Sequence, residues 1–287
     1  MLAEISAFFD EATSTVSYLV VDPGTGEAAV IDPVLDYDPK AGRTATVSAD
    51  RIVAAVQARG ARVIWLLETH VHADHLTAGP YLQDRLGGRT AIGEHVREVQ
   101  AFWGPVFDAE PGFAVDGRQF DRLFCEGDRF RIGGLEVEVW HTPGHTAADV
   151  TYRIGDVAFV GDTLFMPDYG TARADFPGGD ARALYRSIRR ILSLPPETRL
   201  FTAHDYKAPA RAEYAWESTV AAQRAGNVHV RDSISEDDFV AQRVAKDATL
   251  SMPALILPSV QVNMRAGRFP PPAPNGRIYL QTPLNVL

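Results

Sequence analysis

The stretch THVHADH (residues 69–75) decides how the rest of this 287-residue sequence is interpreted. It follows RVIWLLE (62–68), a largely apolar run typical of a strand that is buried on both faces. Three histidines and an aspartate are an odd way to stabilise a turn, which usually needs glycine, proline or small polar residues. Neutral imidazole and carboxylate groups are, however, ligands that zinc, iron and manganese bind. The stretch therefore indicates a metal site at the end of a strand.

Three further apolar runs lead into residues of the same kind. LEVEVW (135–140) runs into HTPGH (141–145), VAFV (157–160) runs into Gly161-Asp162, and RLFTA (199–203) runs into His204-Asp205. Strand ends at one edge of a sheet converge in space, so we expect the four loops to meet. A single isolated histidine would favour a packing or capping role, but four such loops together favour metal binding. The expected ligands are His70, His72, Asp74, His75, His145, Asp162 and His204.

The three remaining histidines lack such a context. His141 has no partner motif, so we expect it to be structural or to lie behind the ligands. His95 and His229 lie in polar segments and are expected to be solvated. The glycine pairs at 87–88 and 178–179 do not match a phosphate-binding loop and are interpreted as turns.

Strand patterns surround the ligand loops. The first 20 residues carry acids among short apolar runs and predict the first strand of a domain. STVSYLVVD (14–22) and EAAVIDPV (27–34) flank a Pro-Gly-Thr-Gly turn and predict a β-hairpin. Residues 130–140 predict two strands around a glycine pair, because Leu, Val and Glu alternate in the second of them.

Helix patterns alternate with these strands. Residues 48–59 predict a helix that Gly60 can end. A polar, helix-like segment extends from the first ligand loop to about Trp103. Asp180 is expected to cap a further helix. The core-facing stripe of that helix is formed by Leu184, Ile188, Ile191 and Leu192.

The sequence changes character after about Gly226. Residues 235–244 predict a capped helix, and a tail containing FPPPAPNG (269–276) follows, which cannot form a regular helix. We expect this tail to wrap the main body as an ordered extension. The chain is therefore divided into a catalytic domain (1–225) and a C-terminal extension (226–287) that packs on the same domain.

Composition restricts the partners and the compartment. The formal net charge of −9 does not favour binding to nucleic acid or to an anionic membrane. Cys125 is the single cysteine, which excludes an internal disulfide and fits a reducing compartment such as the cytoplasm. We expect Cys125 to be a packing or strand-edge residue and not a nucleophile. The sequence has no apolar run of about 18 residues, the length that a membrane-spanning helix needs, and no basic segment of a signal peptide at its start.

The ligand motifs also carry a family resemblance. THVHADH, TPGHT (142–146), GDT (161–163) and AHD (203–205) resemble the metallo-β-lactamase superfamily. This resemblance implies an α/β fold, an αββα sandwich with metal at one edge. Within the superfamily the chain is similar to the glutathione persulfide dioxygenases. FMPDYGTARADFPGG (165–179), AHDY (203–206) and VNMRAG (262–267) carry that similarity over most of the chain.

The same seven ligands serve two chemistries in this superfamily. In the hydrolase branch, which includes glyoxalase II, two zinc ions share them and a bridging hydroxide attacks a thioester. In the dioxygenase branch, the positions of His70, His145 and Asp162 hold one Fe(II), which leaves open positions for a persulfide sulfur and O₂. The other four residues, His72, Asp74, His75 and His204, then orient the ligands and relay protons, or else bind a second metal.

The resemblance implies an iron(II) enzyme that converts glutathione persulfide, O₂ and water into glutathione and sulfite. The alternative is a binuclear hydroxyacylglutathione hydrolase, and the RADF (173–176) and NMRAG (263–267) segments favour the dioxygenase. Arg173 is expected to bind a glutathione carboxylate, although pairing with Asp175 is an equally weighted alternative. Tyr206 is expected near the metal as a hydrogen-bond donor, and Asn263 and Arg265 are expected to close the pocket. The resemblance is compatible with a homodimer. A non-catalytic sensor or electron-transfer role is disfavoured, because the chain has no flavin domain.

Overall fold

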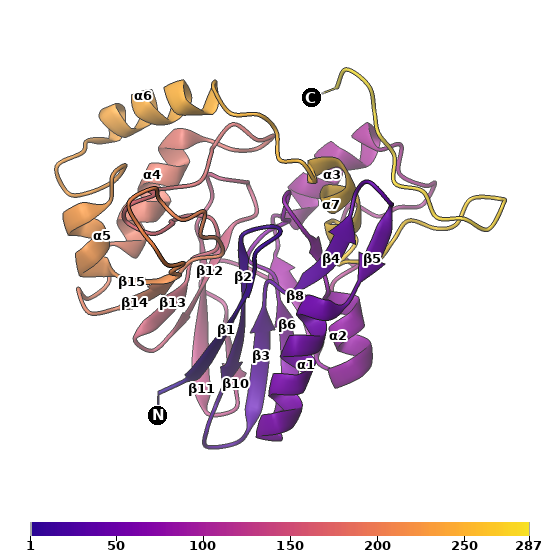
Figure 1. Ribbon diagram of the computed structural model, residues 1–287, viewed down its shortest axis with the longest axis horizontal. Helices are drawn as coiled ribbons and strands as arrows, with labels where there is room; N and C mark the ends of the chain where they lie inside the picture. Colours follow the sequence, from indigo (N-terminus) through magenta and orange to yellow (C-terminus); the bar gives the residue numbers. More distant parts are fainter. Residues whose placement is uncertain (1, 287) are drawn as a thin grey trace.

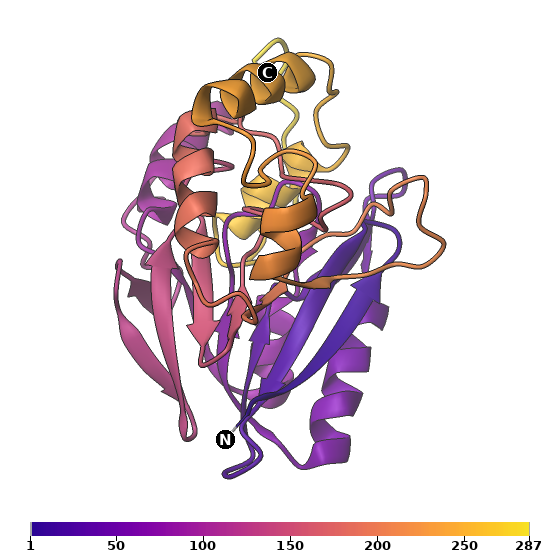
Figure 2. The same ribbon diagram turned by 90° about the vertical axis from the view of Figure 1, so that its left-hand side faces the viewer.

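Two six-stranded sheets face each other in the computed structural model, which describes residues 2–286 (Figures 1 and 2). The first sheet has the order β1-β2-β3-β6-β8-β9. Its strands are β1 (Glu4–Asp10), β2 (Thr15–Val21), β3 (Glu27–Ile31), β6 (Arg62–Leu67), β8 (Arg89–Gly93) and β9 (Arg122–Phe124). The strands are antiparallel from β1 to β3 and parallel from β3 to β9.

The second sheet has the order β10-β11-β12-β13-β14-β15. Its strands are β10 (Arg129–Ile132), β11 (Leu135–His141), β12 (Val150–Ile154), β13 (Val157–Phe159), β14 (Arg199–Phe201) and β15 (Glu217–Thr219). Only β13 and β14 pair in parallel. A small third sheet joins β4 (Val34–Asp38) to β5 (Arg43–Ala45) and to β7 (Leu76–Thr77).

The period-two alternation of the strands explains the layers. In β2, Tyr18 and Val20 point into the core between the sheets, and Leu19 and Val21 point to the opposite face. That opposite face is covered by α1 (Val47–Arg59) and α2 (Gly79–Leu86). The outer face of the second sheet is covered by α4 (Ala181–Ile191), with α6 (Glu236–Asp247) beside it. The fold is therefore the predicted αββα sandwich.

The predicted helix signals lie where the sequence placed them. Gly60 follows α1 in the left-handed conformation, with φ of 60°. Asp180 caps α4, because its side chain accepts a hydrogen bond from the backbone N–H of Ala183. The four residues of the predicted stripe are buried. The serine at 235 caps α6 in the same way, and α5 (Val220–Gly226) ends at the proposed boundary of the extension.

The segment before Trp103 departs from the prediction of a continuous helix-like stretch. It contains α2, then β8, then α3 (Val96–Val106). Gly87 and Gly88, both with positive φ, end the first helix, and the short run Thr90–Gly93 is buried between two parallel neighbours. A five-residue strand of this kind is too short for its period to stand out from the flanking helical pattern.

The C-terminal tail also departs from the prediction. After α7 (Ile256–Asn263), which packs on β7, the chain does not wrap the body. It projects as a mostly exposed loop and returns at Gln281, as Figure 1 shows in yellow. Three consecutive prolines at 270–272 lack backbone N–H groups, so this part of the tail cannot join a sheet or a helix. Among the helices of residues 2–286, none has the length and apolarity that crossing a bilayer requires.

Candidate metal centre

The four loops predicted to carry ligands meet at one edge of the sandwich. His70 follows β6, His145 follows β11, Asp162 follows β13 and His204 follows β14. Because the strands belong to two facing sheets, each sheet contributes ligands from its own strand ends. The second sheet is also bonded to the first ligand loop. The backbone N–H of Val150, at the start of β12, donates a hydrogen bond to Thr69 O in that loop at 2.9 Å.

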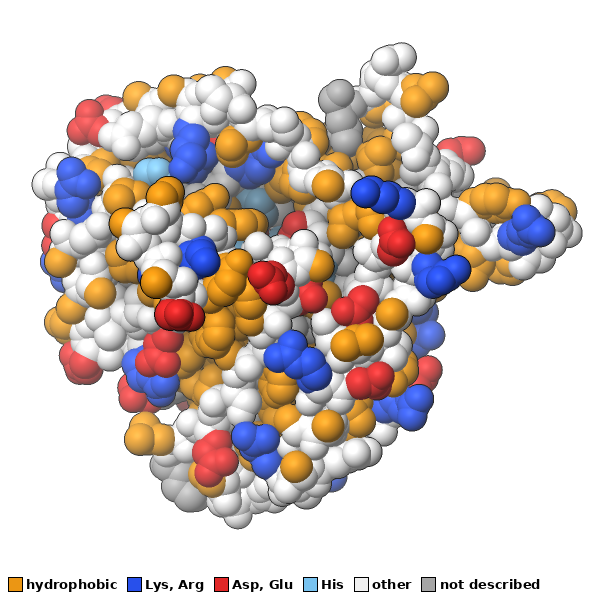
Figure 3. All heavy atoms as spheres, in the orientation of Figure 1, with side chains coloured by type: hydrophobic (Ala, Val, Ile, Leu, Met, Phe, Trp, Pro, Cys, Tyr) orange, Lys and Arg blue, Asp and Glu red, His pale blue; other side chains and the backbone are white. Residues whose placement is uncertain are grey.

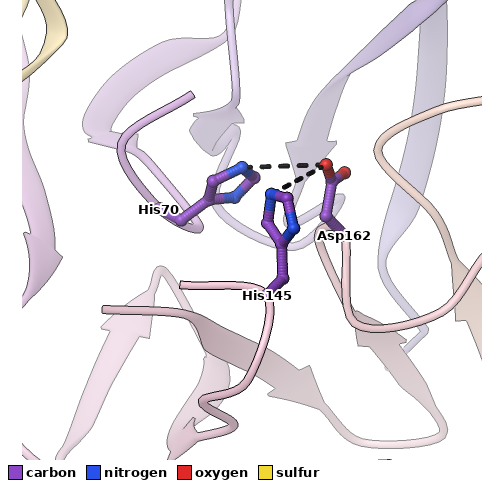
Figure 4. Close-up of side chains that lie close together, drawn as sticks. All are labelled: His70, His145 and Asp162. Carbon is purple, nitrogen blue, oxygen red and sulfur yellow. Dashed lines mark ion pairs between the residues drawn. The ribbon is translucent and has the colours of Figure 1, made fainter. Parts of the chain in front are cut away.

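Two imidazoles and one carboxylate form a compact group, shown in Figure 4. The Nε2 atom of His145 lies 3.5 Å from Asp162 Oδ2, and the Nε2 atom of His70 lies 3.8 Å from the same oxygen. One donor atom from each residue lies within 4.8 Å of the other two. All three side chains are buried. This spacing can close around a single ion with little movement.

The other oxygen of Asp162 faces a second group of ligands. Asp162 Oδ1 lies 3.3 Å from His204 Nε2, which in turn lies 3.2 Å from Asp74 Oδ2. The Nδ1 atom of His75 lies 3.5 Å from that oxygen of Asp74. The carboxylate of Asp162 therefore stands between two sets of donors, where it could also bridge two ions.

His72 lies beside a carboxylate that the sequence did not single out. Its Nε2 atom lies 2.9 Å from Asp32 Oδ1 and 3.6 Å from Glu68 Oε2, although neither of its two buried ring nitrogens forms a hydrogen bond. A carboxylate at one ring nitrogen commonly orients the other one toward a metal. Asp32 is held in turn by the backbone N–H and the hydroxyl of Thr69, at 2.7 and 2.8 Å. Asp32 could be found from the sequence by its position directly after β3, since β3 pairs in parallel with β6, the strand that precedes the first ligand loop.

Unpaired buried atoms at this edge fit a bound cation. His70 Nε2, His72 Nδ1, His75 Nε2, His204 Nε2 and Asp162 Oδ1 are buried and have no hydrogen-bond partner. Buried polar atoms normally do have partners, so each exception needs an explanation. Several such atoms aimed at one small region, all of them metal-ligand types, are explained by an ion among them.

The electrostatics of the site favour the same interpretation. Burial lowers the pKa of His145 to about 4, and it also lowers the pKa values of His70 and His72. These imidazoles are therefore neutral at neutral pH, which is the form that binds metal. Burial, followed by the nearby charge of Asp74, raises the pKa of Asp162. A cation would offset that cost and keep the carboxylate ionised.

A cavity of about 420 Å³ opens onto the centre. Its lining includes Asp74, His145 and Asp162, with an aromatic wall formed by Phe165, Tyr169, Phe176 and Tyr206. Three basic side chains, Arg173, Arg243 and Lys246, complete it. Figure 3 looks toward this region, where histidine appears within a recess that basic side chains border.

Two of the three basic side chains are paired. The guanidinium of Arg173 donates to both oxygens of Asp175, at 2.6 and 2.8 Å, and to Ser251 O at 2.7 Å. Arg243 pairs with Asp247 at 2.6 Å. Lys246 has no carboxylate within 4 Å among residues 2–286. The cavity therefore contains one cation that is free to meet an anionic ligand.

The residues predicted to bind substrate separate into two groups. Arg173 and Tyr206 line the cavity, and the ring of Tyr206 stacks on His204 at 5.5 Å. Asn263 and Arg265 do not line it, so the prediction that they close the pocket is wrong for this cavity. Arg265 pairs with Glu110 at 2.6 Å, outside the cavity lining.

Asn263 instead holds the first ligand loop from behind. Its side-chain amide donates to His72 O at 2.9 Å and to His75 O at 2.7 Å, and it accepts from the backbone N–H of Thr77 at 2.9 Å. His145 is held similarly, because its Nδ1 lies 2.8 Å from Arg173 O. Backbone contacts of this kind fix the ring orientation of ligands.

The remaining histidines are structural. The Nε2 atom of His141 lies 2.9 Å from Ala147 O, and its ring stacks on the partly exposed His95 at 4.1 Å. His229 was predicted to be solvated, and that prediction is wrong. It is half-buried, and its Nδ1 accepts a hydrogen bond from the backbone N–H of Thr171, which lines the cavity. The exposed Cys125 lies directly after β9, at a strand edge as predicted.

Comparison with known proteins agrees with this geometry. The sequence profile of the metallo-beta-lactamase superfamily matches residues 11–204. The chain is 60% identical to a probable metallo-hydrolase of Burkholderia pseudomallei, with 99% of each chain covered. It spans 65% of the length of a beta-lactamase hydrolase-like protein of Xylella fastidiosa, to which it is 54% identical.

Two further relatives carry more specific names. Glyoxylase B2 of Dictyostelium discoideum is 44% identical, with 99% of this chain and 98% of the relative covered. The human persulfide dioxygenase ETHE1 is 30% identical, with 92% and 89% covered. The crystal structure of ETHE1 from Myxococcus xanthus is 29% identical, covers 93% of this chain and 100% of its own, and superimposes with a TM-score of 0.73. With a profile match over more than half of its length, the chain belongs to the metallo-β-lactamase superfamily.

Proposed function

We propose that this chain is an iron(II)-dependent persulfide dioxygenase that acts on glutathione persulfide. The balanced reaction is GSSH + O₂ + H₂O → GSH + SO₃²⁻ + 2 H⁺. The observation that carries the proposal is the compact group of His70, His145 and Asp162 beside the cavity. The similarity to human persulfide dioxygenase and to the ETHE1 structure supports it.

Two imidazoles and one carboxylate are a ligand set suited to Fe(II), which would bind a sulfur ligand and O₂ together and would mediate the transfer of electrons from the persulfide sulfur to O₂. The protein's own residues hold this set in place. Arg173 O fixes the ring of His145, and the hydroxyl of Thr69 lies 3.0 Å from Nδ1 of His70. We infer that His72, Asp74, His75 and His204 orient the centre or bind a second ion.

The cavity suits a substrate with carboxylate groups. Lys246 offers an ammonium group without a carboxylate partner in the described part of the chain, and glutathione carries two carboxylates. We infer that Lys246 and Arg173 receive them, with Arg173 held in place by Asp175. Tyr206 and Tyr169 border the same space, where their rings can pack along the peptide. The single cysteine fits the cytoplasm as the place of action.

A specific observation also favours the alternative, a binuclear thioester hydrolase. The two oxygens of Asp162 face different groups of donors, and the chain is 44% identical to glyoxylase B2. Two zinc ions in such a site could only act as Lewis acids, because zinc has no accessible redox change. The two functions therefore differ in whether O₂ is consumed.

The deciding experiment measures metal content and both reactions on the same preparation. Protein purified without added metal should contain about one iron per chain, as a single facial set of ligands requires. With glutathione persulfide under air it should consume O₂ and release sulfite. Two zinc ions per chain, together with rapid cleavage of S-lactoylglutathione and no O₂ uptake by iron-loaded protein, would establish the hydrolase instead.

A further inference from the structure

One wall of the metal-site cavity has no regular secondary structure. Residues 171–174, here called the cavity segment, belong to no helix or strand of the described chain, and Thr171, Ala172 and Arg173 line the cavity. Throughout residues 2–286, no backbone group of this segment bonds to another backbone group. Buried backbone groups normally have partners, so side chains must supply them and thereby set the position of the segment.

Two side chains of α6 hold the cavity segment at both of its ends. Arg243 Nη1 donates to Thr171 O at 3.2 Å, and the backbone N–H of Ala174 donates to Asp247 Oδ2 at 2.9 Å. Arg243 and Asp247 lie one helical turn apart, on the same face of α6. Their own ion pair joins Nε and Nη2 of the guanidinium to Asp247 Oδ1, at 2.9 and 2.6 Å. The pair therefore reaches the segment with one donor and one acceptor that it does not use internally.

The depth of this ion pair argues against a role in packing alone. The side chains of Arg243 and Asp247 are only 2% and 5% exposed. Removing two charges from water costs free energy that their attraction often only offsets, and apolar side chains of similar size commonly stabilise an interior as well or better. Phe239 of the same helix is such an apolar contact. What the ion pair adds is direction, because each charged group bonds a defined backbone atom of the cavity segment.

The peptide between the two held residues carries the carbonyl group that orients His145. Arg173 O lies 2.8 Å from Nδ1 of that ring. A carbonyl oxygen can only accept, so Nδ1 carries the ring proton. The other ring nitrogen, Nε2, faces Asp162 in Figure 4 and is left with a lone pair for an ion.

His204 shows how such a carbonyl group is fixed elsewhere in the centre. Its Nδ1 lies 3.1 Å from the carbonyl oxygen of Ser14, which directly precedes β2 and is held by the first sheet. The corresponding carbonyl group at His145 lies in a segment without sheet pairing. For His145, α6 therefore takes the place that the sheet has for His204.

We propose that Arg243 and Asp247 are positioning residues of the metal centre, which hold the cavity segment so that Arg173 O keeps the imidazole of His145 turned toward the ion. The inference shares with the proposed function the assignment of His145 as a ligand. It does not depend on whether the centre holds iron or zinc, or on which reaction follows.

The test measures the binding of Co(II), whose visible absorption reports the arrangement of its ligands, to the metal-free full-length chain in competition with a chelator. Arg243→Met/Asp247→Leu removes both contacts to the cavity segment and leaves no buried charge unpaired. This apolar pair should bind Co(II) about 10-fold or more weakly than the wild type, with an altered spectrum, as expected when an outer contact of a ligand is lost. Arg243→Gln/Asp247→Asn keeps a donor for Thr171 O and an acceptor for the Ala174 N–H. This neutral polar pair should retain the wild-type affinity and spectrum.

Val240→Ala separates positioning from stability. Val240 lies on the same helix and packs against the apolar cluster that contains α4, and it does not line the cavity. The substitution should lower the free energy of unfolding of the metal-free protein, measured with denaturant. The affinity for Co(II) and the visible spectrum should stay unchanged.

Three results would overturn the proposal. One is an apolar pair with the affinity and spectrum of the wild type. Another is a neutral polar pair that binds Co(II) as weakly as the apolar pair. The third is a loss of affinity in Val240→Ala as large as that of the apolar pair.

A second comparison applies if the apolar pair does not fold. Asp247→Asn and Asp247→Ala both leave Arg243 without its counter-ion, but only asparagine keeps an acceptor for the Ala174 N–H. Asp247→Asn should therefore bind Co(II) more tightly, and equal affinities would contradict the proposal. If Co(II) binding follows these expectations while iron-loaded protein consumes no O₂ with glutathione persulfide, the positioning role stands and the proposed function alone is wrong.

Discussion

Replacement of Asn263 with alanine should weaken the metal centre, although Asn263 does not line the cavity. The side chain is buried, with 4% of its surface exposed, and its amide supports the ligand loop through three hydrogen bonds. These bonds reach His72 O, His75 O and the N–H of Thr77. The substitution removes the partner of two carbonyl groups and one N–H group, all of them in the interior.

The size of the effect follows from that count. A buried polar group that loses its partner costs about 1–3 kcal/mol, so three such groups should lower the free energy of unfolding by about 3 kcal/mol or more. The loop also loses the contact that fixes its backbone on both sides of Asp74. Loss of an outer contact of this type typically lowers metal affinity by about 10–100-fold.

The assay separates the two effects with a matched control. Denaturant unfolding of metal-free protein gives the change in stability, and competition between metal-free protein and a chelator for Fe(II), without air, gives the affinity. Asn227→Ala is the control, because Asn227 is equally buried and its amide also donates to two acceptors, far from the ligand loop in sequence. It should lower stability alone. Equal Fe(II) affinities for the two variants would refute the assigned role of Asn263.

Three further changes test the centre, the cavity and the fold. Asp162→Ala should abolish metal binding and activity, while Asp74→Ala should keep much of its iron. If elemental analysis shows that both variants lose their metal to the same extent, a site with two ions is favoured. Arg173→Ala should raise KM for glutathione persulfide by about 10-fold or more at constant iron content, since a hydrogen bond to a charged group is worth about 1.5–3 kcal/mol. An unchanged KM would mean that Arg173 only pairs with Asp175 and does not bind the substrate. Burial lowers the pKa of His229 to about 4, whereas the unfolded chain binds the proton near 6.5, so stability should fall as pH drops from about 6.5 to 4 by at most about 3 kcal/mol. In unfolding measurements at pH 7 and 4.5, His229→Gln should lack this part of the pH dependence. If the free energy of unfolding falls by the same amount in the variant and in the wild type, His229 is not its source.

The parts of the site that sequence could predict are those that local pattern encodes. His70, His145, Asp162 and His204 each follow an apolar strand directly, so the direction of the chain alone takes them to the same edge. The αββα arrangement was implied by the motif resemblance, and the helix caps at Asp180 and Gly60 are one-residue signals. Features of this kind can be predicted from the local sequence, without knowing which distant residues they contact in the fold.

The errors arise where a residue's role depends on a distant partner. Asn263 lies 191 residues from His72, and nothing in its own neighbourhood indicates that its amide faces that loop. His229 lies in a segment with several polar residues, although its direct neighbours are Val228 and Val230, and the loop that brings Thr171 against it buries it in part. The role of Asp32 depends on a distant partner in the same way, since it lies beside His72 only through the parallel pairing of β3 with β6.

The same dependence explains why the C-terminal extension belongs to the support of the site. Val260 and Met264 of the α7 region lie in one apolar cluster with Val71 and Ala73 of the ligand loop. Asn263, between them in sequence, adds the hydrogen bonds to the loop's backbone. A chain cut at residue 225 would expose that cluster and leave those carbonyl groups unpaired. The loop that presents His70, His72 and His75 is therefore held by the first sheet on one side and by the extension on the other.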